Sequence, residues 1–436
     1  MMKYDWRRLQ ITTDSADVID AINHFAQQVM SAGTEANKVL NAVEKHPENF
    51  LLHCYTAAFY LYAQKDEETS KALLHLQQAE KLLKYVTDRE RLTYQAIRAW
   101  KQLNYELAIT LFTSITALWP RDCLAAKMAE WMFYCSGQAY QSQRFLAMCE
   151  KMSKENNDNS HFMAIHSFAL ELNGNYAEAH ALALRALKIE AITPWAHHTL
   201  SHILLLKPEI DSDTSAFEHY RSSWDNIFPL LRGHNNWHLG LLYLAKLKIE
   251  KAKEIYQQNI WGNLPNTVLQ QIDAISFLWR MDMLDQTQES EWKIIKKYIP
   301  KNPTDHYTPF HNAHFIYALA RTHGIKAAED SLKTLKEYAS NLSGTQYYVW
   351  HTISLPLFAA SIAFVEKNYK KASELLAPII QEVFCLGGSD AQDELFLQMY
   401  FVSLLKSNKL HEAKQFFDKF LSHYHNTALG QYWFNK

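Results

Sequence analysis

The chain has 436 residues, of which 48% are hydrophobic and 13% aromatic, so it can form several hydrophobic cores and is not a disordered protein. Its formal net charge of −2 gives no electrostatic basis for binding nucleic acid or an anionic membrane, because either partner needs a concentrated basic surface. We therefore expect neither partner.

The cysteines and the apolar runs of the sequence indicate the cellular compartment of the protein. The five cysteines are scattered and never form C-x-x-C, so neither a disulfide framework nor a thiolate zinc site is predicted. The first ten residues, MMKYDWRRLQ, lack the apolar region of a secretory signal. The longest apolar run, Ile353–Val365, contains Pro356 and is shorter than the ~20 residues of a membrane helix. We expect a soluble protein of the reducing cytoplasm.

Local patterns favour helices throughout. Only 11 glycines and 11 prolines occur, and no stretch alternates strictly between apolar and polar residues. An all-α fold is therefore predicted. Residues 1–35 are atypical and are expected to form an N-terminal cap. No linker or break in composition follows, so residues 36–436 are predicted to form one continuous helical-repeat domain.

Several segments begin with an aromatic or aliphatic residue, two spacers and an alanine, followed by an amphipathic helical pattern. The clearest are Tyr105-x-x-Ala108, Tyr176-x-x-Ala179, Ile249-x-x-Ala252, Tyr369-x-x-Ala372 and Leu410-x-x-Ala413. The second helix of a tetratricopeptide unit begins in this way. A small residue is needed there because the two helices of the unit cross most closely at that point.

Weaker matches extend this pattern into a register along the chain. In order, the register positions are Ala36, Ala72, Ala108, Gln143, Ala179, Ala216, Ala252, Gln288, Ala328, Ala372 and Ala413. Every step from 36 to 288 is 35 to 37 residues, and later steps are longer. The period predicts a tetratricopeptide-like right-handed superhelix of antiparallel helix pairs, an α-α solenoid whose concave surface is lined by the first helix of each pair. The repeats around 143, 216 and 288 are degenerate, and we expect distortion there.

Two histidine pairs are the strongest chemical signal. His198 and His202, like His234 and His238, are four residues apart, which places both imidazoles of a pair on one helix face. The offset between the pairs is 36 residues, one repeat. Counting back 19 residues from each register position puts both pairs at the second and sixth positions of successive first helices.

Other polar residues fall into the same stripe of first helices. Trp237 lies between the histidines of the second pair, Asp273 takes the fifth position of the next unit, and His314 takes the sixth position of the unit after that. In tetratricopeptide domains generally, such positions tend to face the concave groove where ligands bind. We therefore expect a histidine-rich pocket within residues 160–320. Arg280 follows Asp273 by seven residues, and a structural salt bridge between them is the plainer expectation.

This pocket supports three functional interpretations. The first is a metal-dependent enzyme with Zn, Fe or Cu held by imidazole and carboxylate ligands. Its ligands would be His198, His202, His234, His238 and Asp273. In the second, the imidazoles act as acids, bases or hydrogen-bond donors around a small molecule. In the third, they bind the acidic tail or carboxylate of a protein partner.

A structural interpretation makes the same histidines satisfied polar residues at helix crossings. Neither pair contains the glutamate of H-E-x-x-H, so no zinc protease is predicted. Further along, Gly387 and Gly388 separate two helical patterns, and Ser389 and Asp390 are possible N-caps of the next helix. This tract is expected to be a helix-to-helix turn rather than a phosphate-binding loop, because no strand precedes it and no lysine follows.

Several tracts, in this order, resemble the tetratricopeptide repeat protein 38 family, also called StaR-like. They are HSFALELNGNYAEA (166–179), PWAHHTLSHIL (194–204), HNNWHLGLLYL (234–244), IDAISFLWRMDM (272–283), FHNAHFIYAL (310–319) and GGSDAQDELF (387–396). The resemblance covers most of the chain from about residue 160 and implies a helical-repeat protein without implying an activity. The family pattern has histidine at the positions of His166, His198, His202, His234, His238 and His314, and aspartate at Asp273. Where the family usually reads G-G-S-x-A-Q-R-D, this chain has Asp393 instead of arginine, which puts an anion-binding role for this corner in doubt.

We therefore predict a helical-repeat protein that binds a peptide segment or a small molecule, with a metal-dependent enzyme as the alternative. The candidate ligand-binding residues are His166, His198, His202, His234, Trp237, His238, Asp273, His314 and Gln392. No catalytic residue is assigned. A divalent metal is expected as a cofactor only in the alternative.

Overall fold

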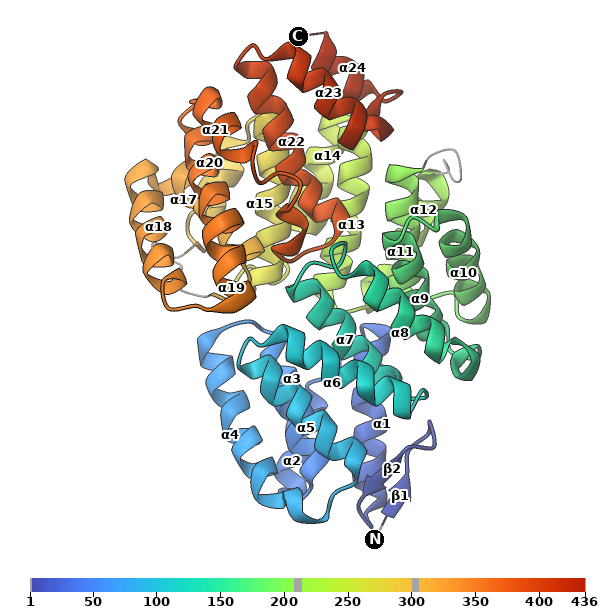
Figure 1. Ribbon diagram of the computed structural model, residues 1–436. Coiled ribbons are helices and arrows are strands. Elements are labelled where there is room, and N and C mark those ends of the chain that lie inside the picture. Colours follow the sequence, from blue (N-terminus) through green and yellow to red (C-terminus); the bar gives the residue numbers. More distant parts are fainter. Residues whose placement is uncertain (1, 208–213, 300–305, 436) are drawn as a thin grey trace. The chain divides into compact units, whose positions relative to one another are not determined.

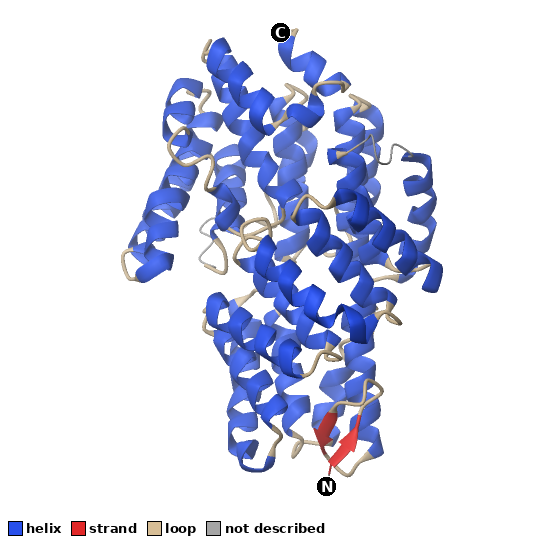
Figure 2. Ribbon diagram, turned by 45° about the vertical axis from the view of Figure 1, so that its right-hand side comes forward, coloured by secondary structure: helices blue, strands red, loops and turns tan. Residues whose placement is uncertain are grey.

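The computed structural model describes residues 2–207, 214–299 and 306–435 and confirms the all-α fold (Figures 1 and 2). Among the described residues, the only sheet is an N-terminal hairpin in which β1 (Met2–Tyr4) pairs antiparallel with β2 (Gln10–Thr12). The contacts between backbones divide the chain into two compact units. The first comprises the described residues of 2–136, 141–203 and 214–232, and the second those of 137–140, 204–207 and 233–435.

Consecutive helices of the first unit pack in pairs, with α3 on α4, α5 on α6 and α9 on α10. The helices are α1 (Ala16–Ser31), α2 (Lys38–Lys45), α3 (Phe50–Leu61), α4 (Asp66–Leu82), α5 (Asp88–Lys101), α6 (Tyr105–Leu118), α7 (Cys123–Cys135), α8 (Ser142–Ser153), α9 (Ser160–Leu172), α10 (Tyr176–Ile189), α11 (Pro194–Leu206) and α12 (Thr214–Tyr220). The end of α11 belongs to the second unit.

The second unit repeats this arrangement, with α17 on α18, α20 on α21 and α22 on α23. Its helices are α13 (Pro229–Ala245), α14 (Ile249–Ile255), α15 (Val268–Met283), α16 (Glu289–Ile295), α17 (Pro309–His323), α18 (Ile325–Ala339), α19 (Gly344–Tyr348), α20 (Leu355–Val365), α21 (Tyr369–Leu376), α22 (Asp390–Lys406), α23 (Leu410–Phe420) and α24 (Ala428–Phe434). The first turn of α13 belongs to the first unit.

The predicted register is confirmed where its pattern is clearest. Fully buried alanines lie in the first two turns of second helices, at Ala72, Ala108, Ala179, Ala252, Ala328, Ala372 and Ala413. Their small side chains allow the paired helices to cross closely. The degenerate repeats differ as expected, since Gln143 is exposed and Gln288 is only the N-cap of the seven-residue helix α16. Ala36 precedes α2 instead of lying within it.

A left-handed residue ends the first helix in many of these pairs. Positive φ angles occur five residues before the register alanine at Leu103, Gly174, Leu247, Lys367 and Asn408. One residue in this conformation ends a helix and reverses the chain direction. Four of the five are not glycine, which is why the sequence pattern did not reveal this shared turn.

One stretch of the described residues, Gly344–Val365, is long and apolar enough to cross a membrane. This stretch is longer than the apolar run Ile353–Val365 noted in the sequence. The reason is that the helix continues from α19 into α20 through a π-helical turn at 349–354. That turn precedes Pro356, which has no N–H to donate to a regular helix. Most of the stretch is buried, and α20 packs against α17, α18 and α21. This burial is typical of a core helix.

Candidate functional site

The second histidine pair lies on α13 with its ring nitrogens close together. His234 Nε2 and His238 Nε2 are 3.2 Å apart, and the two rings meet edge to face. Both histidine-bearing helices begin earlier than the register placed them, at Pro194 and Pro229, because proline suits the first turn of a helix. The pairs therefore lie in the second and third turns of α11 and α13, which corrects the predicted second and sixth positions.

Asp273, on α15, holds the first histidine of this pair. Both of its carboxylate oxygens contact His234 Nδ1, at 3.1 and 3.0 Å. Because a carboxylate only accepts hydrogen bonds, His234 donates its Nδ1–H and its Nε2 carries a lone pair directed at His238. A histidine prepared in this way is a metal ligand with an oriented ring, or a general base. The His234 side chain keeps 17% of its surface exposed, whereas His238 is buried.

Buried groups fix the position of this dyad. Trp237 stacks on the His234 ring, with centroids 5.3 Å apart and an interplanar angle of 10°. Its Nε1–H donates to Ser276 Oγ at 2.8 Å, and that hydroxyl donates to the backbone carbonyl of Asp273 at 3.0 Å. Trp237 is fully buried. Its ring surface is therefore not available for direct contact with a ligand, and its contacts hold the His234 ring in place.

Arg280 does not pair with Asp273, the partner expected from the seven residues between them. Its Nη2 donates to the Ala391 carbonyl at 2.9 Å, its Nη1 donates to the Ser276 carbonyl at 3.3 Å, and the guanidinium lies 5.3 Å from the centroid of the Trp237 ring. Burial lowers the pKa of Arg280 to about 10. The predicted salt bridge between Arg280 and Asp273 is therefore wrong. Arg280 instead contacts the Ala391 carbonyl and the Trp237 ring.

Close packing of α13 on α15 sets the distance between His234 and Asp273. A Cβ at Gly240 would lie 2.5 Å from Cε2 of Phe277 on α15. Gly240→Ala is therefore expected to lower the free energy of unfolding of the second unit by about 1–3 kcal/mol, measured by urea denaturation. Gly233→Ala is the matched control on the same helix, because its nearest contact is an ordinary 3.6 Å and alanine favours a helix. Equal effects of the two substitutions would contradict this packing argument.

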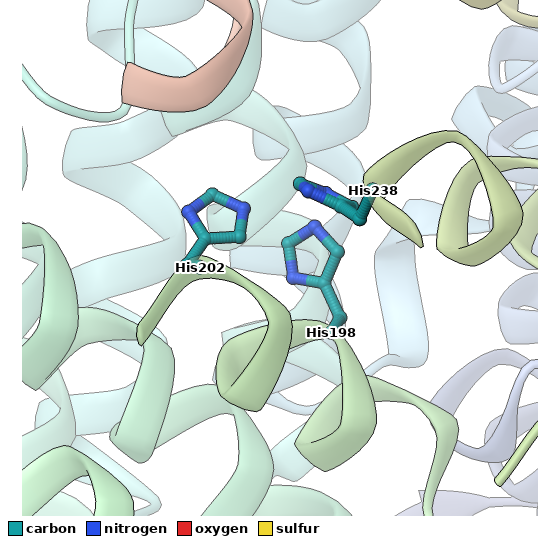
Figure 3. A group of neighbouring side chains, drawn as sticks. All are labelled: His198, His202 and His238. Carbon is teal, nitrogen blue, oxygen red and sulfur yellow. The ribbon is translucent and has the colours of Figure 1, made fainter. Parts of the chain in front are cut away.

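The first histidine pair lies on α11 in the first unit. Figure 3 shows His198 and His202 on the same face of this helix, and their ring centroids are 4.7 Å apart. Glu171, from α9, brings a carboxylate to the pair, with Oε2 3.6 Å from His202 Nδ1. The Phe168 ring meets both imidazoles edge to face. Sequence reasoning missed Glu171, because nothing in the spacing of α9 marks which of its polar residues faces α11.

The remaining candidate residues have their own surroundings. His166 is half-buried on α9, where burial lowers its pKa. His314 is fully buried on α17, with Nδ1 2.8 Å from the Phe310 carbonyl and the ring among Phe310, Trp279 and Phe396. Gln392 Oε1 accepts a hydrogen bond from the Ser389 N–H at 3.1 Å, so it caps α22, and the predicted N-cap at Ser389 is confirmed.

Each unit thus contains a histidine pair with a carboxylate near it, and His166, His314 and Gln392 have the other contacts described above. Imidazole nitrogens and carboxylate oxygens are the donor set of Zn²⁺ and related ions. No family model matches this chain. The histidine–carboxylate geometry therefore carries the functional argument.

Proposed function

We propose that this chain is a tetratricopeptide-type helical-repeat binding protein whose α13 site holds a divalent transition-metal ion through His234 and His238. The separation of the two Nε2 atoms, 3.2 Å, is the observation that supports this. Two nitrogen ligands of one tetrahedral ion, each about 2.0–2.1 Å from the metal, lie roughly 3.3–3.4 Å apart. A small rotation of either ring brings this pair to that distance.

Asp273 supports the same proposal from the outer shell. A metal-bound histidine usually donates its second N–H to a carboxylate, which orients the ring and makes the other nitrogen a better ligand. With two protein ligands, the ion keeps further positions for water or for a donor atom of a small molecule or peptide segment. The chain would then bind its partner through the metal, in the cytoplasm, where its five free cysteines stay reduced.

The resemblance to the tetratricopeptide repeat protein 38 family is part of this proposal. It is supported by the buried register alanines and by the shared left-handed turns, which make successive helix pairs alike. The residues at the α13 site, His234, His238 and Asp273, are among those of the family pattern.

The test is metal analysis of untagged protein reloaded with Zn²⁺ after chelation, comparing wild type with the His234→Ala/His238→Ala variant. We expect the variant to hold one ion fewer per chain. His219→Ala/His411→Ala, which removes two exposed histidines, is the matched control and should retain the wild-type content. Asp273→Asn should weaken binding about 10–100-fold without removing a ligand. Equal zinc in wild type and the α13 variant would refute the proposal.

Metal-dependent catalysis is a second candidate function, favoured by the open positions and by the partial exposure of His234. Catalytic zinc sites keep a position for water and lower its pKa to about 7. Zinc-dependent hydrolysis of an activated ester is then expected to increase with pH around 7 and to vanish in the α13 variant. A rate that is the same with and without zinc would contradict this candidate.

A further inference from the structure

A groove lies between α4 and α5 in the first unit, and several of the side chains that line it are exposed. Its cavity has a volume of about 220 Å³. That volume is well above the ~10–15 Å³ that admits one water molecule, and it is below the ~300–1,000 Å³ of pockets that bury drug-sized ligands. The groove therefore has room for a small molecule.

One face of each helix lines this groove. Leu73 and Glu80 are seven residues apart on α4, and Tyr94 and Lys101 are seven residues apart on α5. Residues at this spacing lie on the same side of a helix because seven residues make about two turns. The groove is therefore formed by two facing stripes of side chains, one from each helix.

The buried part of the lining is apolar. Leu76 and Tyr94 are each 3% exposed and belong to the hydrophobic core of the first unit. Leu73, on the same lining, is 38% exposed and leaves apolar surface in contact with water. A ligand with a short apolar body would cover this surface, and each CH₂ group that becomes fully buried strengthens binding about fourfold.

Two cations and one carboxylate also line the groove. Arg98 and Lys101 lie one turn apart on α5, and neither forms an ion pair among the described residues. The carboxylate belongs to Glu80, which accepts a hydrogen bond from the Tyr94 hydroxyl. Burial and this carboxylate raise the pKa of Tyr94, whereas Arg98 lowers it. Because two cations accompany one carboxylate, the groove has an excess of one positive charge.

This excess favours a ligand with a single negative charge. A phosphate monoester carries about −1.5 to −2 charges at pH 7, so its second charge would be repelled by Glu80. The guanidinium of Arg98 offers two parallel N–H donors, which match the two oxygens of a carboxylate. A carboxylate therefore fits the charge and the donors of the groove.

We infer that the groove between α4 and α5 binds a small monocarboxylate with a short apolar body. The carboxylate pairs with Arg98 and Lys101, and the apolar body covers Leu73 and Leu76. This inference goes beyond the proposed function, because it uses no residue of the α13 site and requires no metal ion.

The test is equilibrium dialysis of hexanoate against the full chain, with a chelator present so that no metal at α13 binds the carboxylate. Hexan-1-ol keeps the apolar body without the charge, and acetate keeps the charge without most of the body. We expect each of them to bind at least about tenfold more weakly than hexanoate.

Variants then separate the two parts of the groove. Arg98→Gln should weaken hexanoate binding about tenfold, the effect of losing a hydrogen bond to a charged group. Leu73→Ser should weaken binding of hexanoate but not of acetate. Both residues are exposed, so the variants should fold. Lys84→Gln is the matched control, because it removes an exposed cation from the connection between α4 and α5 outside the groove, and it should bind as wild type does.

Three results would overturn the inference. The first is no hexanoate binding up to about 10 mM, or equal binding by wild type and Arg98→Gln. The second is equal affinity for hexanoate and hexan-1-ol, which would exclude a role of the cations. The third is tighter binding of hexyl phosphate than of hexanoate, which would exclude a ligand with a single charge. None of these results changes the zinc content that tests the proposed function, so the two proposals can fail independently.

Discussion

Lowering the pH from 7.5 to 5 is expected to cost the second unit about 4 kcal/mol of its free energy of unfolding through two histidines, while the buried Asp393 carboxyl, whose pKa burial raises well above its usual value, acts in the opposite direction. The two histidines, His311 and His314, are both buried on α17. Burial lowers the pKa of each to about 3, and for His311 the neighbouring His314 adds to the effect. The hydrogen bond of His314 to the Phe310 carbonyl opposes the shift without cancelling it.

The direction of this effect follows from proton binding. Histidine in the unfolded chain has a pKa of about 6.5. Above that pH both histidines are neutral in the folded and the unfolded chain, so the free energy of unfolding does not change. As the pH falls below 6.5, only the unfolded chain takes up protons, so stability decreases until the folded pKa of about 3 is reached. At pH 5 each histidine contributes about 2 kcal/mol to the loss, since 1.5 pH units are worth about 1.36 kcal/mol each.

Urea denaturation with a chelator present measures this loss without interference from metal binding, and hydrogen exchange of α17 amides reports on the second unit alone. His314→Gln should remove about half of the pH dependence. Substituting the exposed His411 should leave it unchanged. An equal pH dependence in wild type and His314→Gln would contradict the prediction, because this comparison cancels the opposing contribution of Asp393.

The repeat architecture was largely predictable because it depends on small residues that recur in the sequence. The register alanines must be small where helices cross, so their spacing alone marks the second helices. The left-handed turns could not be predicted in the same way, because Leu103, Leu247 and Lys367 adopt a conformation that their side chains do not favour. There the helix pair dictates the backbone and overrides local preference.

The site was predictable only along each helix. The four-residue spacing correctly placed His234 beside His238 and His198 beside His202, since helix geometry alone brings them together. Contacts between different helices were harder to predict from the sequence. Asp273 was expected near the histidines, but Glu171 was not, because the rotation of α9 about its axis depends on packing across the unit.

A buried ion pair supports the prediction that residues 1–35 form a cap. Arg89 on α5 donates to Asp122 at 2.8 Å, and both side chains are at most 4% exposed. Burial alone would lower the pKa of Arg89, but Asp122 raises it above its ordinary value. The same guanidinium donates to the Gln10 carbonyl of β2, and Glu90 accepts the Thr12 N–H at 2.9 Å. The pair therefore attaches the N-terminal hairpin to the helices of the first unit.

Asp122→Ala is accordingly expected to lower the free energy of unfolding of the first unit by about 3–5 kcal/mol, because it leaves the Arg89 charge buried without its partner. Asp122 Oδ1 also accepts the Ala125 N–H as the N-cap of α7. Asp122→Asn retains that acceptor, so it should recover the ~1 kcal/mol of the cap but not the loss due to charge. Hydrogen exchange of Thr12 should accelerate in both variants, whereas Glu67→Ala, which removes an exposed partner of Lys71, should change stability by less than about 1 kcal/mol. If Asp122→Ala were as mild as Glu67→Ala, water would reach Arg89 and the hairpin would not be held by this pair.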